Sequence, residues 1–193
     1  MIRDGLESER GGWFHIEDEP QFLTKGSFTA YVAGSVRRTA RGSAGISSAV
    51  WSISRDDNAE PPCRYARASS QPDSDEYRAA AAAVLRVLEA IPNGSEVRIR
   101  TRQSNIANAL NGGMREWQRR SWKLKGGGKR NGWEIWDRII DLAHEKKLSV
   151  RGEHLPDDSA VIFLKKYARL IAHGVSRKAG AQQGVCYQFR RGQ

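Results

Sequence analysis

Five short segments carry the residue types or the alternation of β-strands. Residues 28–34, 44–54 and 63–70 are rich in Val, Ile, Thr, Ser and aromatic residues, and loops rich in Arg, Gly, Asp and Pro separate them. Residues 96–101 alternate apolar and basic side chains, as a half-buried strand does, and residues 148–152 form a fifth short segment of this kind. The pattern predicts five strands.

Other apolar positions recur at helical spacing. Residues 77–91 are dense in Ala and Leu and end at a Pro-Asn-Gly stop. Residues 133–147 and 157–173 have the amphipathic pattern of helices, and shorter helical segments occupy residues 104–125. The order strand, strand, strand, helix, strand, several helices, strand, helix predicts an α/β fold in which helices cover a sheet.

The two ends of the chain lack such a period. We expect a flexible N-terminal extension at residues 1–25, one domain at residues 26–173 and a basic C-terminal tail at residues 174–193. No apolar run approaches the roughly 18–20 residues needed to cross a bilayer, and the N-terminus is too charged for a signal peptide. These features predict an intracellular protein with no membrane partner, without distinguishing cytoplasm from nucleus.

The charge balance indicates the kind of partner. The 193 residues contain 32 Lys and Arg against 22 Asp and Glu, a formal net charge of +10. Such an excess predicts an acidic partner, and nucleic acid is the commonest one. The 2 cysteines are too few for a disulfide framework or a four-thiolate zinc site.

Motifs at the joints of the predicted elements resemble those of the ribonuclease H family of the cellular type, over residues 28–172. In that family the first strand ends in a TDGS-like motif, the first long helix begins with a Glu, and the fourth strand ends in TDS. Paired Trp residues precede a basic loop, and a VxGH stretch leads to the last helix. The matching segments here are Tyr31-Val32-Ala33-Gly34-Ser35, Glu76-Tyr77-Arg78-Ala79-Ala80, Thr101-Arg102-Gln103, residues 117–132 and Val150-Arg151-Gly152-Glu153-His154. The resemblance implies a ribonuclease H-like fold with a five-stranded mixed sheet flanked by helices.

The resemblance also implies a site that has lost most of its catalytic groups. The family hydrolyses the RNA of a hybrid with two divalent metals held by carboxylates. Three of the four matching positions are Ala33, Arg102 (or Gln103, if the register slips by one) and Lys165, so Glu76 is the one retained family carboxylate. We therefore expect neither cleavage nor a cofactor.

Two alternatives remain open at this point. In the first, the chain is a divergent nuclease in which Glu76 holds Mg²⁺ or Mn²⁺ together with Asp73, Asp157 or Asp158, and Glu153 or His154 takes the place of a mobile family histidine. In the second, the chain is a structural or assembly component of a nucleoprotein particle and docks on a protein partner.

Basic side chains cluster where the resemblance places a protruding handle. Trp117 and Trp122 within this cluster predict either a small core that anchors the handle or stacking on a base. Arg98, Arg100 and Arg102 alternate along one strand, so they share a sheet face and would form a phosphate track if that face is open. Arg102 is a candidate to replace a metal ion, contacting a phosphate or Glu76. The predicted nucleic-acid-binding residues are Arg37, Arg38, Arg100, Arg102, Arg115, Trp117, Arg119, Arg120, Trp122, Lys123, Lys125, Lys129 and Arg130.

The sequence thus predicts a catalytically inactive ribonuclease H-like domain. Its expected partner is an RNA/DNA hybrid or double-stranded RNA, because both present A-like geometry and 2′-hydroxyl groups to a protein that recognises shape.

Overall fold

The computed structural model describes residues 11–16, 22–37, 45–56, 63–71, 75–178 and 186–191, with side chains for residues 22–37, 47–56 and 75–173. The strands are β1 (Gly11–Ile16), β2 (Ser27–Arg37), β3 (Gly45–Arg55), β4 (Cys63–Gln71), β5 (Glu96–Thr101), β6 (Ser149–His154) and β7 (Cys186–Arg191). The helices are α1 (Glu76–Ala90), α2 (Ser104–Asn108), α3 (Met114–Arg119), α4 (Trp133–Glu145) and α5 (Ser159–Lys178), and a kinked segment (Ala109–Gly113) with non-helical backbone angles at Asn111 and Gly112 joins α2 to α3. No helix among these described residues is long and apolar enough to span a membrane.

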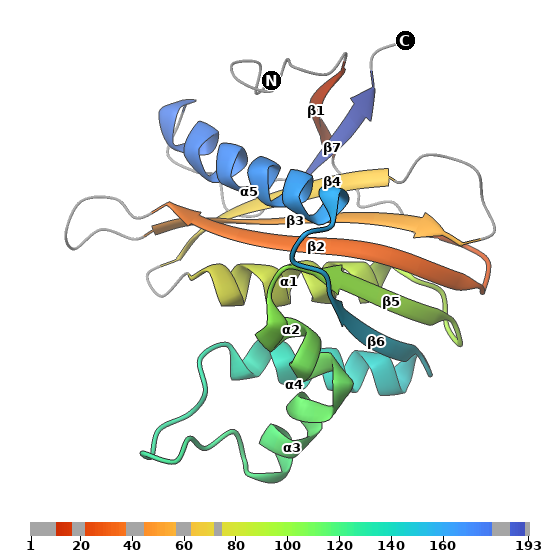
Figure 1. The fold of residues 1–193 in the computed structure, drawn as a ribbon, viewed down its shortest axis with the longest axis vertical. Helices are drawn as coiled ribbons and strands as arrows, with labels where there is room; N and C mark the ends of the chain where they lie inside the picture. Colours follow the sequence, from red (N-terminus) through yellow and green to blue (C-terminus); the bar gives the residue numbers. More distant parts are fainter. Residues whose placement is uncertain are drawn as a thin grey trace.

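The strands form one mixed sheet in the order β1-β7-β4-β3-β2-β5-β6, as Figure 1 shows. β2, β5 and β6 run parallel to one another, whereas the other neighbours pair antiparallel. The five predicted strands correspond to β2 to β6, and the predicted mixed sheet covered by helices is confirmed. The predicted number of five strands was wrong, since the described sheet has seven.

The two additional strands come from segments that the sequence assigns to the flexible extension and the basic tail. β1 pairs antiparallel with β7, from Gly11 opposite Arg191 to Ile16 opposite Cys186, and β7 also pairs with β4. The structure describes only residues 11–16 and 22–25 of the predicted extension, and only residues 174–178 and 186–191 of the predicted tail. Each strand has its partner near the opposite end of the chain, so a local pattern does not reveal the pairing.

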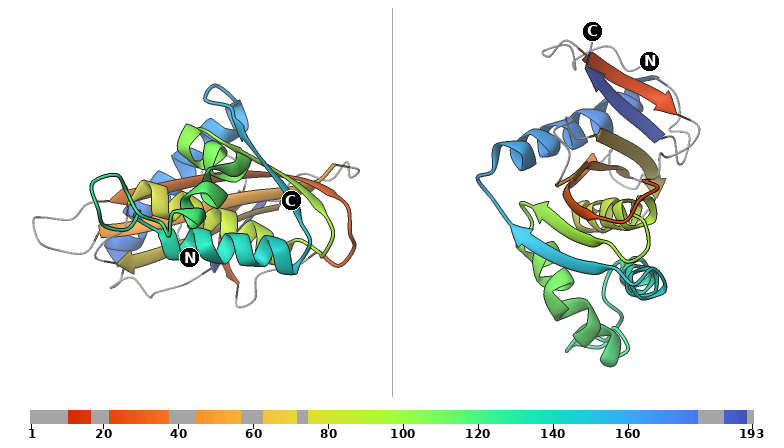
Figure 2. Two further views of the ribbon diagram at one scale, coloured as in Figure 1. Left: turned by 90° about the horizontal axis from the view of Figure 1, so that it is seen from below. Right: turned by 90° about the vertical axis from the view of Figure 1, so that its right-hand side faces the viewer.

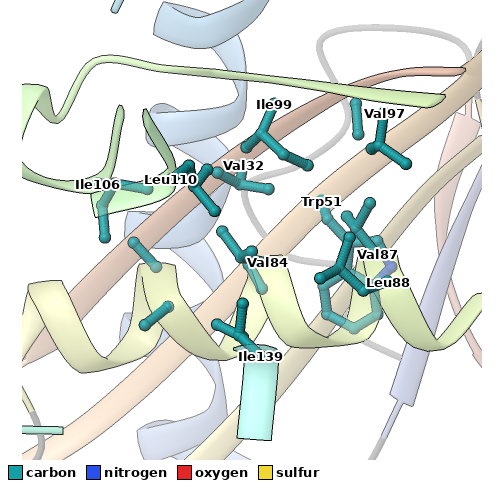
Figure 3. Close-up of a cluster of buried hydrophobic side chains, with 14 of the residues drawn as sticks. Val32, Trp51, Val84, Val87, Leu88, Val97, Ile99, Ile106, Leu110 and Ile139 are labelled. Atoms are coloured by element: carbon teal, nitrogen blue, oxygen red, sulfur yellow. The ribbon is translucent and has the colours of Figure 1, made fainter. Parts of the chain in front are cut away.

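Helices cover both faces of the sheet. Figure 2 shows α5 on one face and α1 with α4 on the other. The alternation of β2 explains this arrangement, because Val32 packs in the cluster under α1 while its neighbour Ala33 packs with Leu164 and Ile171 of α5. Figure 3 shows the larger cluster, in which the α1 residue Val84 lies between the sheet and Ile139 of α4.

Gly34 allows α1 to begin against the end of β2. A Cβ at Gly34 would lie 2.4 Å from the main-chain oxygen of Glu76 and 2.5 Å from the main-chain nitrogen of Ala80. Asp75 caps the helix, because its carboxylate accepts a hydrogen bond of 2.6 Å from the main-chain N–H of Arg78. These contacts fix the first turn of α1, and with it Glu76, beside the sheet.

A basic protrusion, residues 114–132, comprises α3 and the loop that follows it and extends away from the sheet (Figure 1). An isolated bridge between Lys123 and Lys129 closes the loop. Two tryptophans anchor it, since Trp122 is 5% exposed and Trp136 of α4 is fully buried. The ring of Trp117 meets that of Trp136 edge-on, with centroids 6.2 Å apart. The protrusion is therefore anchored through α4 to the main hydrophobic cluster of the domain.

Candidate functional site

A cavity of about 280 Å³ opens at the end of β5, beside residues 32–34 of the neighbouring strand β2. The start of α1 and the first turns of α5 complete its wall. Residues far apart in sequence meet there, among them Ala33, Gly34, Glu76, Arg102, Gln103 and Lys165. The cavity therefore unites every position that the resemblance assigned to the catalytic centre.

Glu76 is held by two donors. Its Oε1 lies 2.6 Å from the Lys165 ammonium and accepts a hydrogen bond of 2.8 Å from Nε2 of Gln103. The ammonium also donates to the main-chain oxygen of Gly34 at 2.6 Å. Lys165 thus links α5 to both β2 and α1, with Glu76 as its counter-charge.

The surroundings lower the pKa of Glu76 below its ordinary value. Burial acts to raise this pKa, but the hydrogen bonds from Lys165 and Gln103 and the charge of the ammonium together outweigh burial. Glu76 is therefore ionised at neutral pH, and its negative charge is balanced within the cavity.

Arg102 and Gln103 have different surroundings at the end of β5. β5 ends at Thr101, and Gln103 then turns its amide onto Glu76. Arg102 lines the same cavity with an exposed side chain, and that side chain has no partner among the described residues. Lys165, not Arg102, is the cation that contacts Glu76.

The described acids considered for a metal site, Asp157 and Asp158, form no metal-binding group with Glu76. Asp158 caps α5, because its carboxylate accepts hydrogen bonds from the main-chain N–H groups of Ala160 and Val161, at 2.8 and 3.1 Å. Asp157 is exposed, and Asp73 lies outside the described residues. Within the described part of the chain, no three Asp, Glu, His or Cys side chains form a group that would hold a metal ion.

The two residues proposed for the mobile histidine position have other partners. Glu153 forms an ion pair with Arg100 over 2.8 Å, and a ring nitrogen of His154 lies 3.0 Å from the main-chain oxygen of Arg102. Both residues thus support the ends of β5 and β6.

Comparisons with solved structures identify the fold. LC9-RNase H1, a type 1 RNase H with the type 2 active-site motif, matches with a TM-score of 0.59 and 18% identity over 86% of this chain and 79% of that chain. The fold is that of ribonuclease H. The RNase H domain of prototype foamy virus matches with a TM-score of 0.53 and 14% identity over 78% of this chain and 93% of that domain.

A third match is a foamy viral protease-reverse transcriptase in complex with an RNA/DNA hybrid. It has a TM-score of 0.54 and 16% identity over 82% of this chain and 22% of that chain. No protein-family model matches the sequence, and neither does any curated protein. The likeness to ribonuclease H therefore concerns the three-dimensional fold.

The residues of the cavity do not fit the two divalent metals of ribonuclease H catalysis. Mg²⁺ prefers several hard oxygen ligands, and here one carboxylate, Glu76, is available and is already paired with an ammonium. The positive charges of Lys165 and Arg102 would repel a divalent cation at this position. We derive no metal-dependent step for this site.

The protrusion presents a dense set of cations. Glu116 is its one acid, and it pairs with Arg119 at 3.6 Å and with Arg120 at 2.7 Å. The exposed basic side chains are Arg115, Arg119, Arg120, Lys123, Lys125 and Lys129, while Arg130 is half-buried. Exposed pairs of this kind contribute little to stability, so these cations remain available to an anionic partner.

The tryptophans predicted to bind nucleic acid are part of the anchor. Trp122 is buried, so the prediction that it contacts nucleic acid was wrong. Trp117 is half-buried, with the Arg130 guanidinium 4.0 Å above its ring and Trp136 at its edge. Lys129 lies 3.5 Å above the ring of Trp133 in the same way. A cation therefore lies over one face of the Trp117 ring and one face of the Trp133 ring.

The predicted phosphate track along β5 is largely neutralised. Arg98 pairs with Asp56 at 2.6 Å, and Arg100 pairs with Glu153 and donates to the Tyr31 hydroxyl at 2.9 Å. The half-buried Arg37 donates to the main-chain oxygen of His173 at 3.4 Å, and Arg38 lies outside the described residues. Arg102 is therefore the strand-end arginine best placed to meet a ligand.

One connection was not foreseen from the sequence. Asn131, at the end of the protrusion, donates to the Asp75 carboxylate and accepts a hydrogen bond of 3.3 Å from Arg78. This bridge joins the basic loop to the first turn of α1, next to Glu76. An Asn in a Gly-rich loop carries no sequence signal for such a contact.

Proposed function

We propose that this protein binds the backbone of an RNA-containing duplex, either an RNA/DNA hybrid or double-stranded RNA, and does not cleave it. The observation that carries the proposal is the Lys165–Glu76 pair, in which an ammonium stands 2.6 Å from the one carboxylate of the cavity. An ammonium supplies positive charge, but it neither activates water for attack nor stabilises a leaving oxygen as a divalent metal does.

The basic protrusion supports the proposal that the protein binds a duplex. Lys and Arg side chains that neutralise phosphates displace condensed counterions, so affinity for the duplex falls steeply with salt. A protein with a similar fold has been solved with an RNA/DNA hybrid, which favours the same class of partner here. The covered tryptophan faces favour phosphate and sugar contacts over base stacking.

A cleavage assay tests the proposal that the protein does not cut the duplex. A 5′-labelled RNA strand annealed to DNA is incubated with the full chain and Mg²⁺ or Mn²⁺, and the products are resolved on a denaturing gel. We expect an intact RNA strand. Cleavage by the wild type that disappears in Glu76→Gln would establish the divergent nuclease, whereas cleavage that persists in this variant identifies a contaminating enzyme.

Fluorescence anisotropy tests the proposed binding to a duplex with labelled hybrid, double-stranded RNA and double-stranded DNA at several salt concentrations. Contact with three or four phosphates gives a slope of log K against log salt of about −3. A flat salt dependence, or no binding at low salt, contradicts the proposal and favours a role in which the domain docks on a protein partner.

A further inference from the structure

Lys165 retains binding capacity beyond its two protein partners. A lysine ammonium has three N–H donors, and among the described residues it meets Oε1 of Glu76 and the oxygen of Gly34. The side chain is 29% exposed, and Lys165 belongs to the cavity wall. One donor is therefore left for a ligand that enters the cavity.

Arg102 adds a second cation to the same cavity. Its guanidinium has five donors in a planar fork, which matches the geometry of a phosphate group. Because the Glu76 charge is balanced by Lys165, the three ionised groups Glu76, Lys165 and Arg102 sum to a net charge of +1. The cavity is thus electrostatically suited to a singly charged anion.

The volume of the cavity agrees with a chain segment rather than a lone ion. The cavity volume of about 280 Å³ is just below the roughly 300–1,000 Å³ of typical small-ligand pockets. This space accommodates a phosphodiester with part of its flanking sugars, and a phosphodiester carries a single negative charge at neutral pH.

The protrusion is bonded to the residue that precedes Glu76. Asn131 of the protrusion bonds to Asp75, the residue that precedes Glu76, and Arg130 precedes Asn131. This bond holds the end of the basic loop at the start of α1, and the next residue of the chain after Asp75 is Glu76 of the cavity wall.

We propose that this cavity is a metal-independent subsite for one backbone phosphate of a nucleic acid, with Lys165 and Arg102 as its donors and Glu76 as the counter-charge that holds the net charge of the cavity at +1. This inference rests on the proposed function and extends it, because it assigns to the cavity a binding role that does not require a divalent ion.

Binding of labelled RNA/DNA hybrid in EDTA tests the subsite, with wild type, Lys165→Gln and Arg102→Gln compared. Each variant should bind about tenfold more weakly, and each should reduce the salt slope by about 1. Lys166→Gln is the matched control, because Lys166 is the exposed next residue of α5 and lies outside the cavity wall. It should bind within about twofold of the wild type.

Glu76→Gln should change the affinity for the hybrid in the opposite direction from Lys165→Gln and Arg102→Gln. Removing the carboxylate raises the net charge of the cavity from +1 to +2, so this variant should bind the hybrid several-fold more tightly. Weaker binding by Glu76→Gln would mean that the pair merely supports the fold and would overturn the proposal. Thermal unfolding of each variant checks that the domain is folded, and Arg102, being exposed, is the variant least able to disturb it.

The outcomes separate the two proposals. If the wild type binds while Lys165→Gln and Arg102→Gln match Lys166→Gln, the subsite is wrong and the proposed function stands. If the wild type binds no nucleic acid, both are wrong. Equal affinity in EDTA and in Mg²⁺ at matched ionic strength is expected, and a requirement for Mg²⁺ would overturn the metal-independent subsite.

Discussion

The ammonium of Lys165 donates a hydrogen bond of 2.6 Å to the main-chain oxygen of Gly34, joining positions 131 residues apart. The same nitrogen lies 2.6 Å from Glu76. One side chain of α5 thus connects β2 to α1 at the wall of the cavity.

Gly34→Ala should destabilise the protein by about 2–3 kcal/mol, because the new methyl group would meet two main-chain atoms of α1 within 2.5 Å. Urea unfolding measures the loss. Gly126→Ala is the matched control, since a Cβ there meets nothing within 4 Å, and it should leave the midpoint nearly unchanged. Equal midpoints for the two variants would contradict the close approach of β2 and α1.

The Lys165–Glu76 pair should make stability depend on pH. The pKa of Glu76 is lowered in the folded protein, so its contribution is present above the ordinary value of 4.5 and is lost as pH falls through the lowered value. Solvent screening limits the effect to about 1 kcal/mol or less. The difference in unfolding free energy between wild type and Glu76→Gln should therefore shrink between pH 6 and about pH 3. A difference that stays constant over this range would exclude the ion pair as its source.

Restoring carboxylates should create a metal site. The triple variant Ala33→Asp, Gln103→Asp, Lys165→Asp places four carboxylates around the cavity and removes the resident cation. At 100 times the dissociation constant, Mn²⁺ would add about 2.7 kcal/mol, which raises the unfolding temperature by about 5–10 °C.

Thermal unfolding with and without Mn²⁺ measures this shift. Wild type should show none, and adding Glu76→Gln to the triple variant should diminish it. An identical response of wild type and triple variant would mean that Lys165 does not decide metal exclusion.

The protrusion should contribute phosphate contacts of its own. Lys123→Gln combined with Lys125→Gln removes two exposed charges from the loop, and the salt slope for duplex binding should fall by about 2. Lys147→Gln is the control, because Lys147 follows the far end of α4, about 20 Å from the loop at 1.5 Å per residue. If the control weakens binding as much as the double variant, the effect reflects net charge and not the protrusion.

The sequence anticipated much of the fold for identifiable physical reasons. β5 and α1 were predicted from their alternation and their Ala content, and both are confirmed. β1 and β7 were missed because each depends on a partner near the other end of the chain. Trp122 was assigned to nucleic acid because a sequence shows an aromatic residue in a basic segment, but not which way it packs.

The candidate site was likewise predicted only in part from the sequence. The motifs indicated that Ala33, Glu76 and Lys165 belong to one centre, and they left a one-residue ambiguity between Arg102 and Gln103. That ambiguity depends on where β5 ends and how the chain turns, which is a property of backbone geometry in the folded sheet. The bridge from Asn131 to Asp75 had no local pattern at all.

The sequence by itself determined the order of elements from β2 to α5 and the excess of positive charge, because composition and periodicity are local properties. Only the tertiary structure decided which cation meets Glu76, which tryptophans are buried and which arginines are already paired. These outcomes depend on contacts of a few ångströms between residues far apart in the chain, and such contacts exist only once the sheet and its helices have packed.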